Sequence, residues 1–245
     1  MPRPNRSDID LFERGILVRL HGVDAGYDAT DILLGIEFEA RAGEVALVTG
    51  PTAAGKTSLL HLLRLALPPR AGRAVILGSD VAKLPAKDRA KLKRRIGYVS
   101  EIPSFVEHWT AFENIALPLR LAGKKPRDFV QDVRELVDFV GLGPAADTLA
   151  GQLSGAERRR AAIARALAAK PDLILVDDPT AGMAPDAGRR IVRLLAEMRR
   201  VGAGVVIASQ DESLAECAPC EHWRLELGRL THVGQTEHYD AGAVQ

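Results

Sequence analysis

Short strands are the first feature that the pattern of hydrophobic and polar residues predicts. Residues 36–40 alternate apolar and charged side chains, as a half-exposed strand does. Residues 45–48, 173–176 and 205–208 are instead apolar throughout. Runs of this kind are typical of strands buried on both faces, as in a parallel sheet flanked by helices, so we expect an α/β protein. The other strands are expected at residues 16–20, 73–77 and 96–99.

Helical periodicity lies between these strands. Between residues 110 and 150 apolar residues recur at helical spacing, interrupted by Pro118, Gly123 and Pro126. We interpret this stretch as part of a helical subdomain, about 101–160, inserted in a single domain of residues 15–235. Residues 1–14 are expected to be a flexible extension and residues 236–245 a C-terminal tail. The other helices are expected at residues 58–67, 87–95, 158–168 and 187–201.

Composition restricts the class of protein. Lys and Arg total 33 against 32 Asp and Glu, so the near-neutral chain gives no reason to expect nucleic acid as a partner. No apolar stretch reaches the ~20 residues of a membrane span, and the first residues lack the apolar core of a signal peptide. We therefore expect a cytoplasmic protein. This agrees with the presence of only two cysteines, too few for a disulfide framework.

The two cysteines, Cys217 and Cys220, have C-x-x-C spacing with His222 nearby. One alternative is a zinc or redox site, and the other is two ordinary residues near a turn. A structural zinc site needs four ligands, and no second Cys/His pair stands at a suitable spacing. We therefore favour the second alternative.

The segment GPTAAGKT, residues 50–57, follows an apolar strand and precedes a helical segment. Gly50 and Gly55 let the backbone turn so that successive N–H groups point inward, and the helix N-terminus adds positive potential. Lys56 can then reach the β- and γ-phosphates, and Thr57 can bind Mg²⁺. A glycine-rich turn without a ligand is the alternative, which this context disfavours. The predicted nucleotide-binding residues here are Gly50, Pro51, Thr52, Ala53, Ala54, Gly55, Lys56, Thr57 and Ser58.

Two carboxylates, Asp177 and Asp178, follow the apolar run at 173–176. At the end of a buried strand, Asp177 is placed to hold Mg²⁺, and Asp178 to position or deprotonate a water molecule. Paired Asp residues also occur in turns and helix caps without any such role. The phosphate loop earlier in the chain favours the magnesium interpretation.

Together these motifs resemble ABC-type ATPase subunits over nearly the full length of the chain. The resemblance also rests on YVSE at the Q-loop, LSGAE at the signature, LILVDD at Walker B, PTAGMAPD at the D-loop and ASQD at the switch position. It implies a P-loop NTPase core with a mixed sheet, an N-terminal antiparallel β part and an inserted helical subdomain. The runs AFENIALPLRLAGKKP and RVGAGVVIASQD are most similar to the FtsE group of cell-division ATPases. The lipoprotein-release and macrolide-export ATPases remain alternatives.

The resemblance assigns further roles. Tyr27 would stack on adenine, and Glu101, at the Q-loop position, would act with Asp178 and Gln210 in catalysis and also bind the metal with Thr57 and Asp177. The signature would contact ATP held by the partner subunit of a dimer. Its residues are Ser154, Gly155, Ala156 and Glu157.

The signature segment also carries local structural information. Ser154 can cap the following helix, and Glu157, three positions later, completes a capping box whose helix N-terminus suits a phosphate. A capping box without any ligand contact is the alternative. The run of Arg158, Arg159 and Arg160 could contact phosphates or an acidic surface of a partner, but we favour a solvated helix face.

The chain departs from the family pattern mainly where water attacks. Asp178 replaces a Glu, Gln210 replaces a His and Glu101 replaces a Gln. Ala156 replaces a signature Gly, and Ala184 stands where the D-loop usually has Asp. Because Lys56, Thr57 and Asp177 are intact, we expect ATP and Mg²⁺ binding with slow hydrolysis.

Three function classes follow from these expectations. The first class is a slow ATPase, and the second is a non-hydrolysing, ATP-gated scaffold. In both, the chain would form a homodimer or a heterodimer with an intact ABC ATPase. The expected partner is an FtsX-like integral membrane protein, with this subunit peripheral on the inner face of the bacterial plasma membrane. A nucleic-acid-associated relative is the third class, and the short helical insert and neutral charge disfavour it.

Overall fold

The computed structural model describes residues 15–236. The predicted extension, residues 1–14, lies outside the described residues, as do residues 237–245 of the predicted tail. The last strand ends at Thr236, one residue inside that predicted tail.

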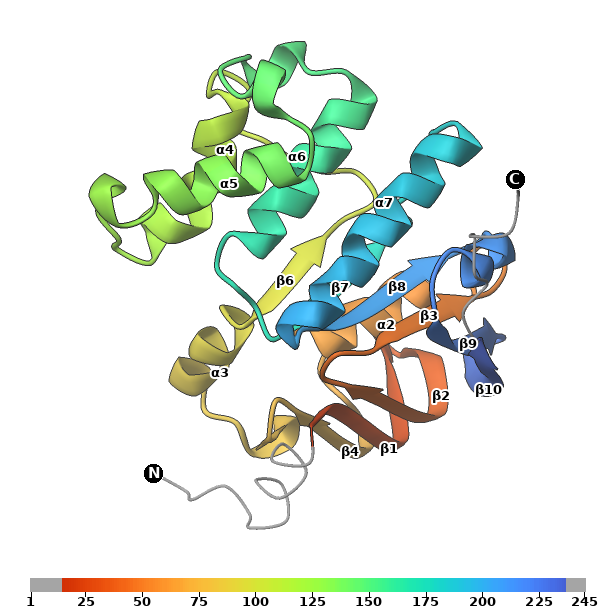
Figure 1. The fold of residues 1–245 in the computed structure, drawn as a ribbon. Coiled ribbons are helices and arrows are strands. Elements are labelled where there is room, and N and C mark those ends of the chain that lie inside the picture. Colours follow the sequence, from red (N-terminus) through yellow and green to blue (C-terminus); the bar gives the residue numbers. More distant parts are fainter. Residues whose placement is uncertain (1–14, 237–245) are drawn as a thin grey trace.

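A six-stranded sheet forms the centre of the molecule (Figure 1). Its strand order is β10-β9-β3-β8-β7-β6, and every neighbouring pair is parallel except β9 and β10. Since neighbouring parallel strands end at the same edge, the segments that follow β3, β7 and β8 lie together. The strands are β3 (Val45–Thr49), β6 (Ile96–Val99), β7 (Leu173–Asp177), β8 (Gly204–Ser209), β9 (Cys220–Glu226) and β10 (Arg229–Thr236).

A second, antiparallel sheet has the strand order β2-β1-β4-β5. Its first two strands extend well beyond the predicted segments at residues 16–20 and 36–40, because register shifts interrupt the simple alternation of residues along β1. The strands are β1 (Ile16–Tyr27), β2 (Thr30–Arg41), β4 (Ala71–Ile76) and β5 (Ser79–Asp80). The expectation of an N-terminal antiparallel part agrees with this sheet.

Helices cover both faces of the central sheet, and three of them form a separate group on one side (green, Figure 1). That group, α4 to α6, is the observed helical subdomain, in which α4 packs on both α5 and α6. The helices are α2 (Lys56–Leu63), α3 (Ala86–Lys93), α4 (Ala111–Leu121), α5 (Val130–Phe139), α6 (Gly155–Leu167) and α7 (Pro185–Glu197). Short 3-10 turns include η5 (Met198–Val201) and η6 (Glu212–Glu216).

The alternating faces of the central strands belong to two apolar cores. Val45, Leu47 and Val205 point into the core that contains α4 to α7, whereas Ala46 and Val48 point into the core that contains α2 and the antiparallel sheet. The buried leucines of α2 are therefore held between the two sheets. This packing fixes the phosphate loop, which lies between β3 and α2.

Candidate nucleotide site

The predicted site residues converge at one edge of the central sheet. Thr49 at the end of β3 pairs with Ser209 at the end of β8, and Asp177 at the end of β7 pairs with Ala208. The phosphate loop and Gln210 follow the ends of β3 and β8, and the Asp177–Asp178 pair spans the end of β7. The structure thus places these three motifs side by side.

The phosphate loop has no room for side chains at its first glycine. A Cβ atom at Gly50 would lie 2.0 Å from the carbonyl oxygen of Leu225 in β9, so only glycine fits. At the other end, Gly55 has a φ of 106° and begins α2 without a capping side chain. The N–H groups of the first turn are therefore available to a phosphate, which fits the nucleotide interpretation.

Lys56 lies folded back over this loop. Its Nζ donates hydrogen bonds to the carbonyl oxygens of Gly50 (2.7 Å) and Pro51 (2.8 Å). Burial lowers the pKa of Lys56, while the nearby carboxylates of Asp178, Asp177 and Glu101 oppose that shift. The ammonium group thus binds the loop and is under the influence of carboxylates predicted to act in catalysis or to bind the metal.

Asp177 is buried at the end of β7, with 5% of its surface exposed. Burial raises the pKa of Asp177, although a hydrogen bond from the Thr57 side chain opposes the shift. Tyr98 donates a long hydrogen bond of 3.5 Å to Asp177 Oδ2, and burial together with Asp177 raises the pKa of Tyr98 to about 12. The structure thus brings two predicted metal ligands, Thr57 and Asp177, within hydrogen-bonding distance of each other.

This donor set fits magnesium, which prefers oxygen ligands and keeps several water molecules. Within residues 15–236, no three His, Cys, Asp or Glu side chains converge to hold a metal ion by themselves. Phosphate oxygens and water would therefore complete the coordination around Thr57 and Asp177. Glu101, the third predicted ligand, is exposed in the segment after β6.

The residues expected to act on water contact the strand ends and the phosphate loop. Asp178 Oδ1 accepts a hydrogen bond of 3.3 Å from Ser209 Oγ, and its backbone has a φ of 40°. Gln210 Oε1 accepts a hydrogen bond of 2.9 Å from Thr52 Oγ1 in the phosphate loop. The departures from the family pattern at positions 178 and 210 therefore lie beside the loop.

Tyr27 ends β1 and is 42% exposed. Its hydroxyl lies 2.8 Å from Nδ1 of His61 in α2, so the ring is tied to the helix that follows the phosphate loop. The sequence carried no signal for His61, because a single histidine in a helix has no distinctive spacing.

The arginine run on α6 was expected to be a solvated helix face, and that prediction is wrong. Arg159 is 6% exposed, and its guanidinium donates to the carbonyl oxygens of Ser100 (3.0 Å) and Glu101 (2.7 Å). Arg160 donates to the carbonyl oxygen of Gly141 at 3.0 Å. Carbonyl groups of loops far away in the sequence take the place of water here.

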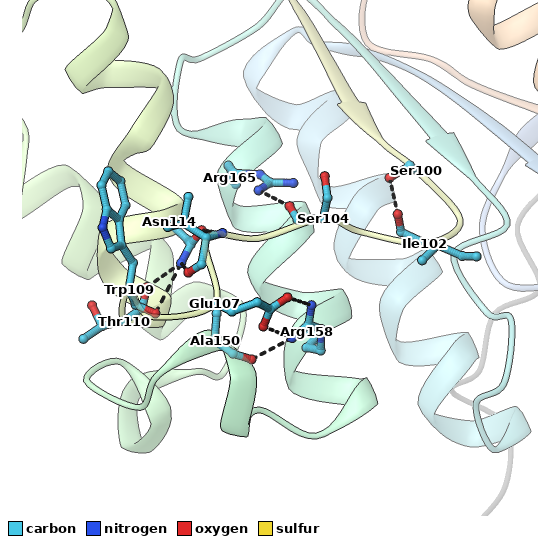
Figure 2. A network of polar contacts seen from close by, with 11 residues as sticks. Ser100, Ile102, Ser104, Glu107, Trp109, Thr110, Asn114, Ala150, Arg158 and Arg165 are labelled. Carbon is cyan, nitrogen blue, oxygen red and sulfur yellow. Dashed lines mark hydrogen bonds and ion pairs between the residues drawn. The ribbon is translucent and has the colours of Figure 1, made fainter.

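Two further arginines hold the segment between β6 and α4 (Figure 2). Arg158 makes two hydrogen bonds to the Glu107 carboxylate, at 2.7 and 2.9 Å, and a third to the carbonyl oxygen of Ala150. Arg165 donates to the carbonyl oxygen of Ser104 at 2.6 Å. Both guanidinium groups also lie over the ring of Phe105. The segment is therefore attached to the helix that carries the signature residues.

The predicted capping box at the start of α6 is confirmed. Ser154 Oγ accepts a hydrogen bond from the backbone N–H of Glu157, and the Glu157 carboxylate accepts one from the backbone N–H of Ser154. Gly155 and Ala156 are exposed in the first turn. Ala184, at the D-loop position, begins α7 without a capping side chain.

The C-x-x-C pair lies away from these motifs. Cys217 follows η6, and Cys220 is buried at the start of β9 with its Sγ 3.3 Å from Thr236 Oγ1. Burial raises the pKa of both thiols. No helix in the described part of the chain is long and apolar enough to cross a membrane.

Comparison with known sequences gives one family and several similar proteins. The model of the ABC transporter family matches residues 33–181. The ATP-binding protein LolD 2 of a lipoprotein-releasing system in Caulobacter vibrioides is 36% identical over 211 residues, which cover 85% of this chain and 91% of the relative. LolD of Gluconobacter oxydans, also an ATP-binding protein of a lipoprotein-releasing system, is 37% identical over 204 residues, which cover 81% of this chain and 88% of the relative.

Comparison with solved structures gives the same fold. A dimeric ATP-binding cassette in a post-hydrolysis state, bound to ADP and phosphate, has a TM-score of 0.79 and 26% identity, and covers 90% of this chain and 98% of its own. The predicted fold class is therefore confirmed. The relatives named here are of the lipoprotein-release type, which was one of the alternatives to FtsE.

Proposed function

Because the chain belongs to the ABC transporter family, we propose that it binds Mg-ATP at the edge of the central sheet and dimerises on the nucleotide. The observation that supports this most directly is the convergence of the phosphate loop, the Thr57–Asp177 pair and Gln210 at adjacent strand ends. Fold similarity alone would not carry a function, so the proposal is supported by this arrangement of side chains.

In this proposal the loop and the start of α2 hold the phosphates. Backbone N–H groups of residues 50 and 52–58 donate to the phosphate oxygens, since Pro51 has no N–H group. Lys56 exchanges its two carbonyl contacts for the β- and γ-phosphates. Tyr27, at the end of β1, offers its exposed ring to the adenine. A magnesium ion would neutralise phosphate charge, held by Thr57 and Asp177, with Glu101 as a candidate third ligand.

Hydrolysis is proposed to be slow. Asp178 is one methylene shorter than the family's Glu, and misplacement by about 1 Å can cost a factor of roughly one hundred. Gln210 can hydrogen-bond a phosphate but cannot carry a positive charge. Asp178, Gln210 and Glu101 remain the candidate catalytic residues, with turnover well below that of relatives whose motifs are intact.

A dimer would place the signature of one subunit on the ATP of the other. Ser154, Gly155, Ala156 and Glu157 form the exposed, capped start of α6, whose free N–H groups and positive dipole end suit a γ-phosphate. The partner subunit is either a second copy of this chain or an intact ABC ATPase. Since the described part of the chain has no membrane-spanning helix, a separate membrane protein is the proposed docking partner, at the inner face of the plasma membrane.

The membrane partner is proposed to be a lipoprotein-handling permease. The relatives at 36% and 37% identity support this choice, because both are named as ATP-binding subunits of lipoprotein-releasing systems. An FtsX-like partner in cell division is the second candidate, favoured by the runs AFENIALPLRLAGKKP and RVGAGVVIASQD. Depletion of the protein distinguishes them: lipoproteins retained in the inner membrane support the first, and undivided cells with normal lipoprotein sorting support the second.

The ATP proposal is tested by measuring equilibrium ATP binding, dimerisation and phosphate release on the same preparation. We expect Mg-ATP binding and a nucleotide-dependent dimer with slow phosphate release, and loss of all three in Lys56→Ala. Binding and dimerisation without any release would select the scaffold. Absence of ATP binding in the folded wild-type protein would overturn the proposal, and release at the rate of intact relatives would overturn slow hydrolysis.

A further inference from the structure

We propose that Arg159 is a positioning residue of the nucleotide site: a buried cation on the signature helix that holds the backbone of Ser100 and Glu101 and offsets the charge of Glu101, Asp177 and Asp178. The part of this inference that concerns ATP rests on the proposed function. None of the family motifs quoted above assigns a role to Arg159.

The first support is the depth and direction of the side chain. Arg159 is a buried charged residue that contributes both terminal nitrogens to two consecutive carbonyl oxygens, those of Ser100 and Glu101. A buried charge is costly unless it is paired or hydrogen-bonded. The two carbonyl oxygens accept hydrogen bonds but carry no full negative charge, so we infer that nearby anions compensate the charge of Arg159.

Three carboxylates supply that charge. Burial lowers the pKa of Arg159, and the shift is opposed by Asp178, Glu101 and Asp177. The same three residues oppose the lowered pKa of Lys56. The same three carboxylates therefore act on both cations, Lys56 in the phosphate loop and Arg159 on α6.

Other arginines of the same helix do not share this environment. Arg165 is half-buried and also donates to a carbonyl oxygen, that of Ser104, but burial alone lowers its pKa and no acidic neighbour contributes. Arg158 is paired with Glu107 (Figure 2). Arg165 is thus a matched control with the same helix, the same type of bond and no carboxylate group.

The position of Arg159 has two consequences. By holding the carbonyl groups of Ser100 and Glu101, it fixes where the Glu101 side chain leaves the backbone. Its charge attracts ATP and repels Mg²⁺, so that its loss should weaken binding of metal-free ATP more than binding of Mg-ATP. The ratio of the two affinities therefore reports on Arg159 specifically.

The first experiment measures equilibrium ATP affinity in EDTA and in excess Mg²⁺ for the wild type, Arg159→Gln, Arg159→Lys and Arg165→Gln. We expect Arg159→Gln to lose about tenfold in EDTA and at most about threefold with Mg²⁺. Arg159→Lys should recover most of the metal-free affinity, because it keeps the charge. An unchanged ratio in Arg159→Gln, or an equal change in Arg165→Gln, would overturn the inference.

The second experiment needs no nucleotide. Thermal unfolding is measured for Arg159→Gln, Arg165→Gln and Asp178→Asn, and for the two double variants that combine Asp178→Asn with each arginine substitution. We expect Asp178→Asn to recover part of the melting temperature lost in Arg159→Gln, because it removes a carboxylate left without its cation, and to recover nothing in Arg165→Gln. Strictly additive effects would overturn the charge role of Arg159. A wild-type protein that binds no ATP would overturn the proposed function. The comparison of melting temperatures between single and double variants would still decide the role of Arg159.

Discussion

At the scale of single residues, Asp178 shows how backbone conformation limits the chemistry of the site. Its φ of 40° lies in the left-handed region, which Asp tolerates better than most residues with a Cβ. A longer carboxylate such as Glu would reach further toward the phosphates. Glu is less favourable than Asp in the left-handed conformation, by about 1 kcal/mol. The short side chain is therefore compatible with the fold at the expense of reach.

The first prediction concerns this residue and its neighbour across the loop. Asp178→Glu combined with Gln210→His is expected to raise the phosphate-release rate by about ten- to one-hundredfold, because it restores carboxylate reach and a group able to carry positive charge. Steady-state phosphate release checks it, and adding Lys56→Ala should abolish the gain. No gain from the pair would place the defect elsewhere, with Ala156 the next position to restore.

The second prediction concerns Asp177, whose pKa is raised by burial. An acid with a folded pKa above its unfolded value loses stability as pH rises from the unfolded pKa, about 4, through the folded one. Asp177→Asn is therefore expected to raise the melting temperature at pH 7 in EDTA by about 2 °C, with the difference shrinking toward pH 4. The Mg²⁺ enhancement of ATP affinity should fall in the same variant. A lower melting temperature at pH 7 would contradict this account.

At the scale of elements, two helices begin with the same local device. Thr110 and Glu113 form a capping box at α4, and Ser154 and Glu157 form one at α6. Both satisfy two N–H groups that would otherwise lack partners. Only the α6 box belongs to the predicted signature, so the pair separates helix stability from nucleotide contact.

The third prediction uses that pair. Thr110→Ala and Ser154→Ala should each cost about 1 kcal/mol of unfolding free energy, because each removes a capping hydroxyl. Only Ser154→Ala is expected to weaken ATP-dependent dimerisation, by about tenfold or less. Chemical denaturation and size-exclusion chromatography with Mg-ATP measure the two effects. Equal loss of dimer in both variants would show that helix stability, not a signature contact, controls assembly.

At the scale of the whole molecule, the helical subdomain and the central sheet share one apolar core. Residues of α4, α5 and α6 pack in the same cluster as Val45, Leu47 and Val205 of the sheet. The antiparallel sheet shares the second cluster with the opposite face of the same strands. Neither the helical subdomain nor the antiparallel sheet buries its apolar face alone. Unfolding of either one by itself would therefore expose apolar side chains of the central sheet.

The fourth prediction follows from this shared core. The chain has two tryptophans, Trp109 in the segment before α4 and Trp223 in β9. The ring centroids of Trp223 and Phe38 are 5.2 Å apart. In Trp109→Phe the remaining Trp223 reports on the unfolding of the sheet. In Trp223→Phe the remaining Trp109 reports on the unfolding of the helical subdomain. Each substitution can change the overall stability, so the urea midpoint of each variant is also measured by circular dichroism. After correction for that change, we expect the two fluorescence midpoints to coincide. A separate, earlier transition for Trp109 would contradict a common core.

Much of the fold was predictable because its signals are local. Unbroken apolar runs marked β3, β7 and β8, and helical spacing marked the helical subdomain. The β9–β10 hairpin was missed, because its residues mix aromatic, charged and apolar side chains without a clear period. The hairpin depends instead on its place beside β3 and against β2, where Leu34 donates a hydrogen bond to the Gly228 carbonyl oxygen.

The sequence by itself determined the phosphate loop, the acidic pair after β7 and the capping box of α6, because each depends on residue types at short, definite spacings. Only the tertiary structure decided the left-handed conformation of Asp178, the contact of Gln210 with Thr52 and the burial of Arg159. Arg159 and Glu101 are 58 residues apart. Burial and hydrogen bonding at that separation depend on how helices and loops pack, which no local pattern of residues contains.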